Sequence, residues 1–502
     1  MTALGDFLGG LPPEPDHRPF PRVAVSGETW RLASEALAEG MLSLAGLWGD
    51  AGAVHMAVAD PGCVDYAVLT LPCVGGTFPS VARLHPPALR LERAIADLYG
   101  YAAEGATDGR PWLDHGRWPV RPPLSARAHA TPAGSYDFLP AEGESLHQIP
   151  VGPVHAGIIE PGHFRFTANG EAVVRLEQRL GYVHKGVDAL MKGATVDNAA
   201  RLAGRVSGDS TVAYAIAFAR AVEAAAGVEA PPRAVWLRAL MAELERIANH
   251  FGDIGAVCND AAFSLIHAHF GALREQALRA AAVAFGHRLM MDRVVPGGVA
   301  ADLGHEGDTA IRALVAEVRA RFPELIALYD GTASLQDRTV GTGFTSPALT
   351  RQYAAGGHVG RASGRGIDSR KAPGYPPYDR LSFDVPVLAD GDVNARVWVR
   401  IREVEQSLGL IDQILAGLPG GALAAPVPPL RTGEGMALAE AFRGDVLAWV
   451  RLAGDGTVAR AHLRDASWFQ WPLLEAAIEG NIVADFPLCN KSFNCSYSGH
   501  DL

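Results

Sequence analysis

The stretch Arg205-Val206-Ser207-Gly208-Asp209-Ser210 has a C-terminal counterpart in Cys495-Ser496-Tyr497-Ser498. Each stretch places two side chains of the serine or cysteine type three residues apart. Thiolates at all four positions would form a four-sulfur socket for a soft transition metal. Three of the four positions are serine. Because a serine hydroxyl is a hard ligand that stays protonated near neutral pH, the sequence predicts a metal-enzyme scaffold without most of its metal ligands.

Both stretches also have a local interpretation. Ser210 or Asp209 can accept a hydrogen bond from the first N–H groups of the helix that follows, and we expect this capping role for at least one of them. Cys495 and Ser498 can equally be a small buried thiol and a polar residue near the chain terminus. A helix cap does not exclude a relict metal site, so both interpretations stay open.

The composition is that of a globular protein without a nucleic-acid surface. The chain has 502 residues, 48% hydrophobic and 20% charged, with a formal net charge of -11, which disfavours contact with nucleic-acid phosphates. Five cysteines are too few for a disulfide framework. We expect no signal peptide in Met1 to Pro13 and no transmembrane helix, and therefore a cytosolic protein that can still dock on an integral membrane partner.

The patterning of apolar residues predicts an α+β fold. Residues 1–118 are expected to form a small α+β domain, and residues 119–145 a proline-rich linker or an ordered wrapping arm. Residues 146–502 are expected to form a mainly helical domain, a bundle of long helices with peripheral β hairpins.

Individual elements follow from hydrophobic periodicity and turn signals. The expected hairpins pair Val54–Ala59 with Tyr66–Leu71, Phe164–Phe166 with Ala172–Arg175, and Val446–Leu452 with Val458–Leu463. The expected helices are Pro87–Leu98, Thr211–Ala226, Ala234–His250, Ala262–Met291, Thr309–Tyr329 and Ala395–Leu418. Thr211–Ala226 is almost entirely small and apolar, which indicates burial on most faces.

Several histidines stand where they could reach a cavity. His155 and His163 flank a glycine-containing loop, although histidines in loops are mostly exposed to solvent. His184 precedes Lys185-Gly186, where Gly186 could end a helix and leave the basic side chain at its C-terminus. That capping account and a functional role for His184 are equally open.

Two charged segments have weaker signals. Glu243, Arg246 and His250 lie on one predicted helix. The default interpretation is a polar helix face that pairs with other helices, and the more specific alternative is a path for protons. The loop from Arg361 to Arg370 is dense in arginine, glycine and aspartate and could hold an anion. No phosphate-binding loop, dinucleotide fingerprint, nucleophile elbow or C-x-x-C pair occurs in the sequence.

Further blocks of sequence resemble a known family. These are Val151-Gly152-Pro153-Val154-His155, Gly181-Tyr182-Val183-His184-Lys185-Gly186, Glu243-Leu244-Glu245-Arg246-Ile247-Ala248-Asn249-His250, Gly297-Gly298-Val299, Arg361-Ala362-Ser363-Gly364, Gly433-Glu434-Gly435 and Arg443-Gly444-Asp445. In this order they resemble the large subunit of energy-converting (group 4) NiFe hydrogenases and its relative, the D-type subunit of NADH–quinone oxidoreductase (complex I). The block Leu91–Gly100 resembles the signature of the C-type subunit of the same complex. The fused order, C-type before D-type, is that of formate hydrogenlyase-type hydrogenases.

The departures from this family concern its metal centre. The hydrogenases carry four cysteines where this chain has the vestigial positions Ser207, Ser210, Cys495 and Ser498. One cysteine in four cannot bridge two metals, so we expect the NiFe centre to be absent. Quinone-reducing relatives have a tyrosine at the position of Gly208 and a second histidine after the one matching His155, neither of which is evident here. Lys185 replaces the usual arginine near the partner's Fe–S cluster.

The resemblance implies the large subunit of a membrane-associated complex like hydrogenase-4 and complex I. We expect the catalytic residues of its cavity to be His155, His184, Arg205 and Asp209, and the cofactor-binding residues to be Lys185 and Arg361. The implied partners are an Fe–S small subunit and integral membrane antiporter-like subunits, which would hold this chain peripherally on the cytoplasmic side of the inner membrane. No cofactor is expected on this chain itself, and quinone and NAD are ligands implied for the complex. The alternatives are a non-catalytic structural or coupling subunit and an active NiFe hydrogenase.

Overall fold

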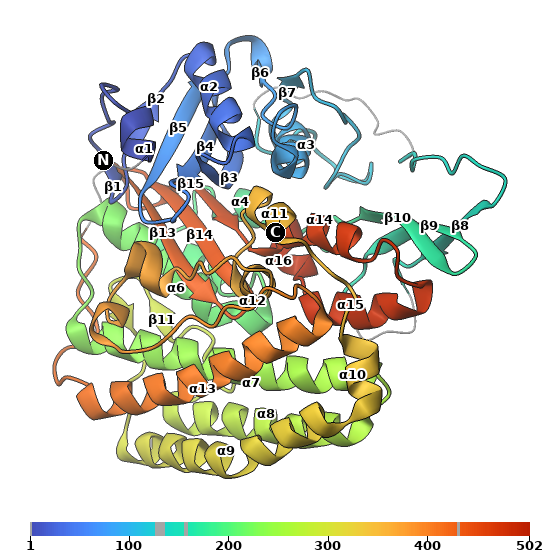
Figure 1. Ribbon diagram of the computed structural model, residues 1–502. Coiled ribbons are helices and arrows are strands. Elements are labelled where there is room, and N and C mark those ends of the chain that lie inside the picture. Colours follow the sequence, from blue (N-terminus) through green and yellow to red (C-terminus); the bar gives the residue numbers. More distant parts are fainter. Residues whose placement is uncertain (1–2, 126–135, 155–158, 429–431) are drawn as a thin grey trace.

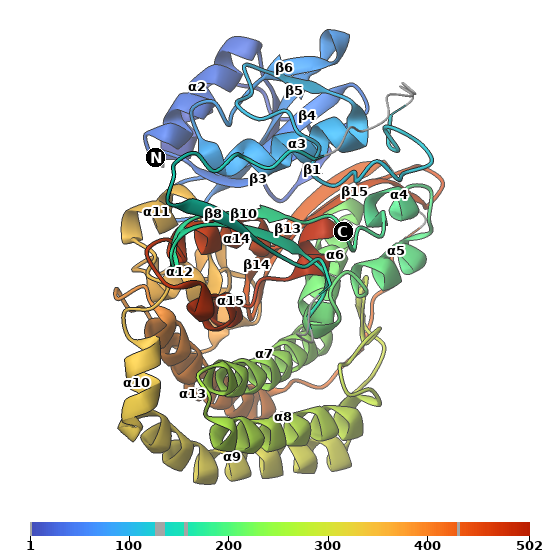
Figure 2. The ribbon, with the colours of Figure 1, turned by 90° about the vertical axis from the view of Figure 1, so that its right-hand side faces the viewer.

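The computed structural model describes residues 3–125, 136–154, 159–428 and 432–502, and its elements lie in three layers (Figures 1 and 2). A small N-terminal sheet lies at the top of Figure 1, a second sheet with short helices in the middle, and a set of long helices at the bottom. Helices and strands both contribute substantially, so the α+β prediction is confirmed.

The N-terminal layer is built on a four-stranded sheet. Its order is β2 (Arg22–Ala24), β5 (Tyr66–Pro72), β4 (Ala53–Ala59) and β3 (Ser43–Asp50), with α2 (Gly27–Ala38) and α3 (Leu89–Tyr99) beside it. Antiparallel pairing of β4 with β5 confirms the first predicted hairpin. The predicted helix at 87–98 is also confirmed, and it ends where Gly100 takes the left-handed conformation with φ 71°.

The middle layer is a second four-stranded sheet. Its order is β1 (His17–Arg18), β13 (Gly433–Ala441), β14 (Gly444–Leu452) and β15 (Val458–Arg464). The predicted hairpin at 446–463 is thus confirmed, as two strands of a sheet that is central to the molecule. Trp48 of β3 lies against Trp449 of β14, with ring centroids 5.6 Å apart, so the two sheets share a core.

The long helices form the lower layer. They are α7 (Pro232–Asp260), α8 (Ser264–Phe285), α9 (His305–Gly331) and α13 (Val393–Gly417), and α6 (Thr211–Ala226) packs between α7 and the central sheet. These helices confirm the sequence predictions, although α7 continues ten residues beyond the predicted end at His250. Burial of nearly every residue of α6 confirms the prediction from its small apolar sequence.

The remaining elements connect these layers around the C-terminus. A three-stranded sheet of β8 (Leu146–Val151), β9 (His163–Asn169) and β10 (Ala172–Arg179) contains the predicted hairpin at 164–175. The helices near it are α4 (Val187–Met191), α5 (Val196–Ala203), α14 (Ser467–Ala477), α15 (Phe486–Phe493) and α16 (Tyr497–Asp501). The smaller elements are α1 (Ala3–Phe7), β6 (Thr77–Pro79), β7 (Ala102–Glu104), β11 (Val294–Val295), β12 (Gly298–Val299), α10 (Ala333–Thr339), α11 (Pro347–Gln352) and α12 (Gly357–Ala362).

A search of the described residues for membrane-spanning helices found none with the length and apolarity required. The described part of the proline-rich segment packs against neighbouring elements. The backbone N–H of Leu139 donates to Glu177 at 2.8 Å, and Arg110 donates to the carbonyl of Asp137. These contacts attach residues 137–139 to Arg110 on one side and to Glu177 of β10 on the other.

Candidate functional site

The two serine-containing stretches meet between α6 and α16. A single 3-10 turn, Gly208–Ser210, leads directly into α6. The Ser207 hydroxyl donates to Asp209 at 2.8 Å and lies 3.0 Å from the hydroxyl of Ser496 in the C-terminal stretch. Since the one proton of Ser207 goes to Asp209, Ser496 is the donor of the second hydrogen bond. The predicted proximity of the two stretches is therefore confirmed.

Asp209 is the centre of this cluster, and its partner is Arg443 from the turn between β13 and β14. Two nitrogens of Arg443 donate to the two carboxylate oxygens at 2.6 and 2.8 Å, and a further bond of 3.2 Å reaches Ser210. The side chain of Arg443 is 5% exposed and that of Asp209 36%. Burial would raise the pKa of Asp209, but the charge and hydrogen bonds of Arg443 outweigh it and lower this pKa to about 2. Asp209 is therefore an ionised carboxylate open to the surface.

The predicted capping role of Asp209 and Ser210 is wrong. Ser210 makes no capping hydrogen bond with its side chain, and the carboxylate of Asp209 accepts from serines and Arg443. The first N–H groups of α6 donate instead to Glu245 of α7, from Val212 at 2.7 Å and from Ala213 at 3.1 Å. Burial raises the pKa of Glu245 to about 8 despite these two bonds. A glutamate side chain from another helix thus takes the place of the local cap, and no local sequence signal indicates this contact.

The C-terminal stretch places its one cysteine in an interior position. Cys495 follows the left-handed Asn494 at the end of α15 and is buried. Burial raises the pKa of its thiol well above the ordinary value, with only partial opposition from Arg443. The backbone N–H of Ser498 donates to the carboxylate of Glu160 at 3.1 Å. Glu160 was missed by the sequence analysis, although it stands between the two histidines that flank its loop.

The other predicted site residues are distributed around this cluster. His155 lies outside the described residues. The Nδ1–H of His184 donates to the carbonyl of Asp501 at 2.6 Å, and its ring lies 4.8 Å from that of Trp118. The ammonium of Lys185 donates to the carbonyl of Val206 at 2.9 Å, directly beside Ser207. Lys185 therefore contacts the serine stretch, whereas His184 contacts Asp501 and Trp118.

The interpretation of Gly186 as the end of a helix is wrong. Gly186 precedes α4 instead, with φ 70°, and its N–H donates to the carbonyl of the last residue, Leu502. The loop from Gly181 to Gly186 is held by Asp501, which accepts from the N–H groups of Gly181 and Val183. This loop is thus shaped by the chain terminus, which a local capping rule cannot detect.

Arg205 and Arg361 make their contacts elsewhere. Arg205 forms a bidentate ion pair with Asp292 at 2.6 and 2.7 Å, and both side chains are partly exposed, 44% and 37%. Arg361 is fully buried and donates to Glu403 and Glu440. The structure therefore brings neither arginine into contact with the serines.

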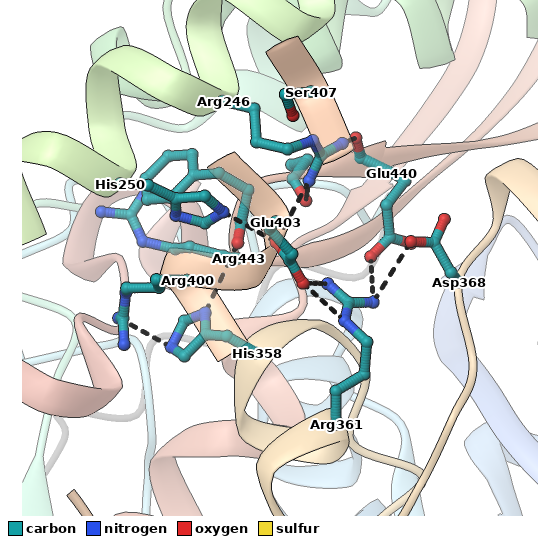
Figure 3. A network of polar contacts seen from close by, with 12 residues as sticks. Arg246, His250, His358, Arg361, Asp368, Arg400, Glu403, Ser407, Glu440 and Arg443 are labelled. Carbon is teal, nitrogen blue, oxygen red and sulfur yellow. Dashed lines mark hydrogen bonds and ion pairs between the residues drawn. The ribbon is translucent and has the colours of Figure 1, made fainter. Parts of the chain in front are cut away.

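Arg361 belongs to a buried network between α7, α12, α13 and β13 (Figure 3). Glu403 accepts from His250 and from Arg361, each at 2.7 Å. Glu243 in the same region accepts from Arg370, Tyr378 and Ser407. Burial opposes ionisation of Glu403, but Arg361 and His250 hold its pKa well below the usual range. The default prediction of a polar helix face paired to other helices is confirmed for Glu243 and His250.

A chain of polar contacts links the network to the serine cluster. Arg443 donates to the carbonyl of Asn494, whose side-chain amide donates to Asp253 at 2.8 Å. Asp253 also accepts from Arg400 at 3.1 Å, and Arg400 lies 2.9 Å from His358. Figure 3 shows Arg400 and His358 below His250, with Asp368 on the far right of the view. The end of α15 is therefore the connection between site and network.

Known proteins identify the scaffold. The family described as the 49 kDa subunit of respiratory-chain NADH dehydrogenase matches residues 261–432. Formate hydrogenlyase subunit 5 of Escherichia coli (strain K12) is 32% identical over 438 residues, covering 84% of this chain and 77% of the relative. The D-type subunit of NADH-quinone oxidoreductase from Desulfotalea psychrophila is 31% identical over 353 residues, 69% of this chain and 93% of the relative. The chain belongs to the family that contains these subunits. The predicted resemblance is therefore confirmed.

A solved structure supports the same assignment. One chain of the membrane-bound sulfane sulfur reductase, an archaeal respiratory membrane complex, superposes with a TM-score of 0.68 at 26% identity. The match covers 72% of this chain and 99% of that chain. Hydrogenase-4 component G of Escherichia coli (strain K12) is a further relative, 31% identical over 435 residues, 84% of this chain and 76% of the relative. The relatives are subunits of hydrogenase-like and complex I-like assemblies.

The donor set at the serine cluster does not fit the NiFe centre of the hydrogenases in this family. Three hydroxyls replace thiolates, and the hydroxyl protons of Ser207 and Ser210 are committed to Asp209. The remaining thiol, Cys495, has a raised pKa, which disfavours the thiolate that a soft metal requires. Within the described residues, no group of three or more histidine, cysteine, aspartate or glutamate side chains is arranged to hold a metal ion. An arginine–carboxylate pair fills the centre of the cluster instead.

Proposed function

We propose that this chain is the large subunit of a membrane-associated oxidoreductase complex of the hydrogenase-4 and complex I type, and that it works without a NiFe centre. Its role is electron transfer, or coupling of redox chemistry to ion movement, together with an Fe–S small subunit. The observation that carries the proposal is the Asp209–Arg443 ion pair between Ser207 and Ser210. It puts a fixed pair of charges where a metal centre would need four thiolates.

The proposed site consists of groups that bind and protonate a small acceptor. Arg443 supplies donors for an anionic reduced species, and Asp209 holds its guanidinium in a fixed orientation. His184 remains a predicted member of the site, and its ring nitrogen donates to the carbonyl of Asp501. His155 and Arg205 remain predicted members of the site, and Lys185 and Arg361 remain predicted cofactor contacts. Any quinone or NAD in the complex would be bound with the partner subunits.

The proposed assembly follows from the names of the relatives. The sulfane sulfur reductase is described as membrane-bound and respiratory, and the family includes NADH-quinone oxidoreductase subunits. We place this chain on the cytoplasmic side of the inner membrane, held there by an Fe–S small subunit and by antiporter-like membrane subunits. The partner's cluster would face the loop that contains Lys185, whose ammonium contacts the serine stretch.

Metal content and turnover of the purified complex test the proposal. We expect nickel well below one atom per chain and no hydrogen evolution from reduced viologen. We expect the reduced partner cluster to be reoxidised by one of two acceptors, a short-chain quinone or polysulfide, the latter suggested by the name of the sulfane sulfur reductase. Stoichiometric nickel together with hydrogen evolution would establish an active hydrogenase and overturn the proposal.

A non-catalytic coupling subunit is the second candidate. The observation that favours it is the internal satisfaction of the cluster, in which both Ser207 and Ser210 donate to Asp209. In that case neither acceptor would reoxidise the partner's reduced cluster faster than the uncatalysed background reaction in solution. The same experiment therefore separates the two candidates.

A further inference from the structure

A cleft of about 790 Å³ lies away from the serine cluster. It is lined by the C-terminal half of α6, the first turns of α7, the loop 373–380, the middle of β13 and Phe20 of the N-terminal region. Arg220 on α6 lies ten residues beyond Ser210, which is about 15 Å along the helix axis. The volume falls within the range of about 300–1,000 Å³ that is typical of small-molecule sites.

The two arginines Arg238 and Arg220 of this cleft differ in whether a carboxylate neutralises their charge. Arg238 and Glu223 neutralise one another through bonds of 2.5 and 3.0 Å, and Glu223 also accepts from the N–H of Gly297. Arg220 has a different environment. Its guanidinium donates to the carbonyl of Leu438 and lies 4.3 Å from the ring centroid of Tyr375, and it has no ion pair with any carboxylate of the described residues.

Other arginines without a carboxylate partner have more hydrogen-bond acceptors than Arg220 has. Arg396 donates to three acceptors, the Ser492 hydroxyl and two backbone carbonyls. Arg179 likewise donates to three backbone carbonyls. Among the described residues, Arg220 has only the one acceptor, and burial lowers its pKa. A guanidinium with unused donors on the wall of a cleft is a binding site for an oxyanion.

The rest of the lining is apolar and aromatic. Phe20, Ile216 and Trp236 contribute hydrophobic walls, and the Tyr375 ring backs the guanidinium. An inorganic anion alone would leave these walls exposed to water, whereas an apolar group would cover them. The lining thus requires a ligand with both an oxyanion and an apolar part.

We propose that this cleft is a binding site for a small amphipathic organic anion, whose carboxylate or phosphate bonds to Arg220 and whose apolar body lies between Phe20 and Trp236. The ligand is separate from the redox site, since α6 carries the serine cluster at one end and Arg220 on its later turns. Phe20 precedes the first strand of the N-terminal sheet, so an occupant would also contact both halves of the chain.

The test uses two fluorescent probes on the purified full-length chain. The probes are the anion 8-anilinonaphthalene-1-sulfonate and the neutral N-phenyl-1-naphthylamine, which have similar aromatic bodies. We expect Arg220→Gln to weaken binding of the anion at least tenfold and that of the neutral probe less than twofold. Arg220→Lys should retain most of the anion affinity. The matched control is Arg279→Gln on α8, an exposed arginine outside the lining of the cleft, which should change neither affinity more than twofold.

A second variant keeps the proposal testable if Arg220→Gln does not fold. Ala224→Trp retains Arg220 and fills the cleft, so both probes should lose affinity. Decanoate and decyl phosphate then identify the head group, because the preferred anion should displace the sulfonate probe while decanol does not. Unchanged anion binding in Arg220→Gln or in Ala224→Trp overturns the proposal, and so does displacement by decanol equal to that by both anions.

Discussion

Two regions of this molecule are built from the same arginine–carboxylate pairs but differ in their access to solvent. In the network around Glu403, the side chains of Glu403 and Arg361 are 1% and 0% exposed. At the serine cluster, Arg443 is equally buried but the side chain of Asp209 is 36% exposed. Pair chemistry alone therefore does not distinguish a structural group from a reactive one. The two kinds of group differ in solvent access. In a structural group every charged side chain is buried, whereas in a reactive group one charged side chain remains accessible to a small molecule or a partner.

The largest effect is expected from breaking the closed network. Glu403→Gln leaves Arg361 and His250 buried beside a neutral amide, and removing one member of such a group costs about 3–5 kcal/mol of folding free energy. Urea unfolding at pH 7 measures this loss. The control is Glu275→Gln, which removes the exposed ion pairs with Arg279 and Arg288 and should leave the unfolding midpoint unchanged. A loss below about 1 kcal/mol for Glu403→Gln would show that the network is not a stabilising unit.

The second effect concerns pH and Glu245, the side chain of α7 that accepts from the first N–H groups of α6. The pKa of Glu245 in the fold, about 8, lies above its unfolded value of 4.5. Its contribution to stability is therefore fully present below about pH 4.5 and is lost as pH rises through 8. We expect a difference on the order of 3 kcal/mol between pH 5 and pH 8.5 in the wild type that Glu245→Gln lacks. Parallel stability curves for the two proteins over this range would contradict the raised pKa.

The third effect separates stability from activity at the open pair. Asp209→Asn removes the charge that orients Arg443 but leaves a polar side chain at a partly exposed position, so we expect a stability loss of only about 1 kcal/mol. Acceptor-dependent reoxidation of the partner's cluster should fall at least tenfold, because Arg443 would lose its fixed orientation. Full activity in Asp209→Asn would rule out this pair as the site of the reaction.

The sequence predicted those features that depend on local pattern or on spacing. Periodicity predicted α6 at its observed bounds, and the serine spacing in two distant stretches predicted that they meet. Turn chemistry predicted the pairing of β9 with β10 around Asn169-Gly170. Each of these signals lies within a short window or repeats a motif, which is why a single sequence was sufficient.

The sequence did not predict contacts between residues hundreds of positions apart. Arg443 is 234 residues from Asp209, and nothing in either stretch indicates the other. The prediction that a local residue caps α6 was wrong for the same reason, because Glu245 of a neighbouring helix accepts from the first N–H groups in place of Ser210. Interior ion pairs are fixed by the packing of whole elements, so local rules identify the charged residues but not their partners.

The smallest effect on stability is expected at Arg205, which tests its predicted catalytic role. Its ion pair with Asp292 is exposed on both sides, and such pairs contribute about 0.2–1 kcal/mol. Arg205→Gln should therefore unfold within about 1 kcal/mol of the wild type, with Arg312→Gln at another exposed pair as the matched control. Because Arg205 does not contact the serines, its loss should reduce acceptor reduction less than Asp209→Asn does. If both variants lost activity equally and kept their stability, Arg205 would belong to the reactive site together with Asp209. The accessible region of the site would then be larger than the Asp209–Arg443 pair alone.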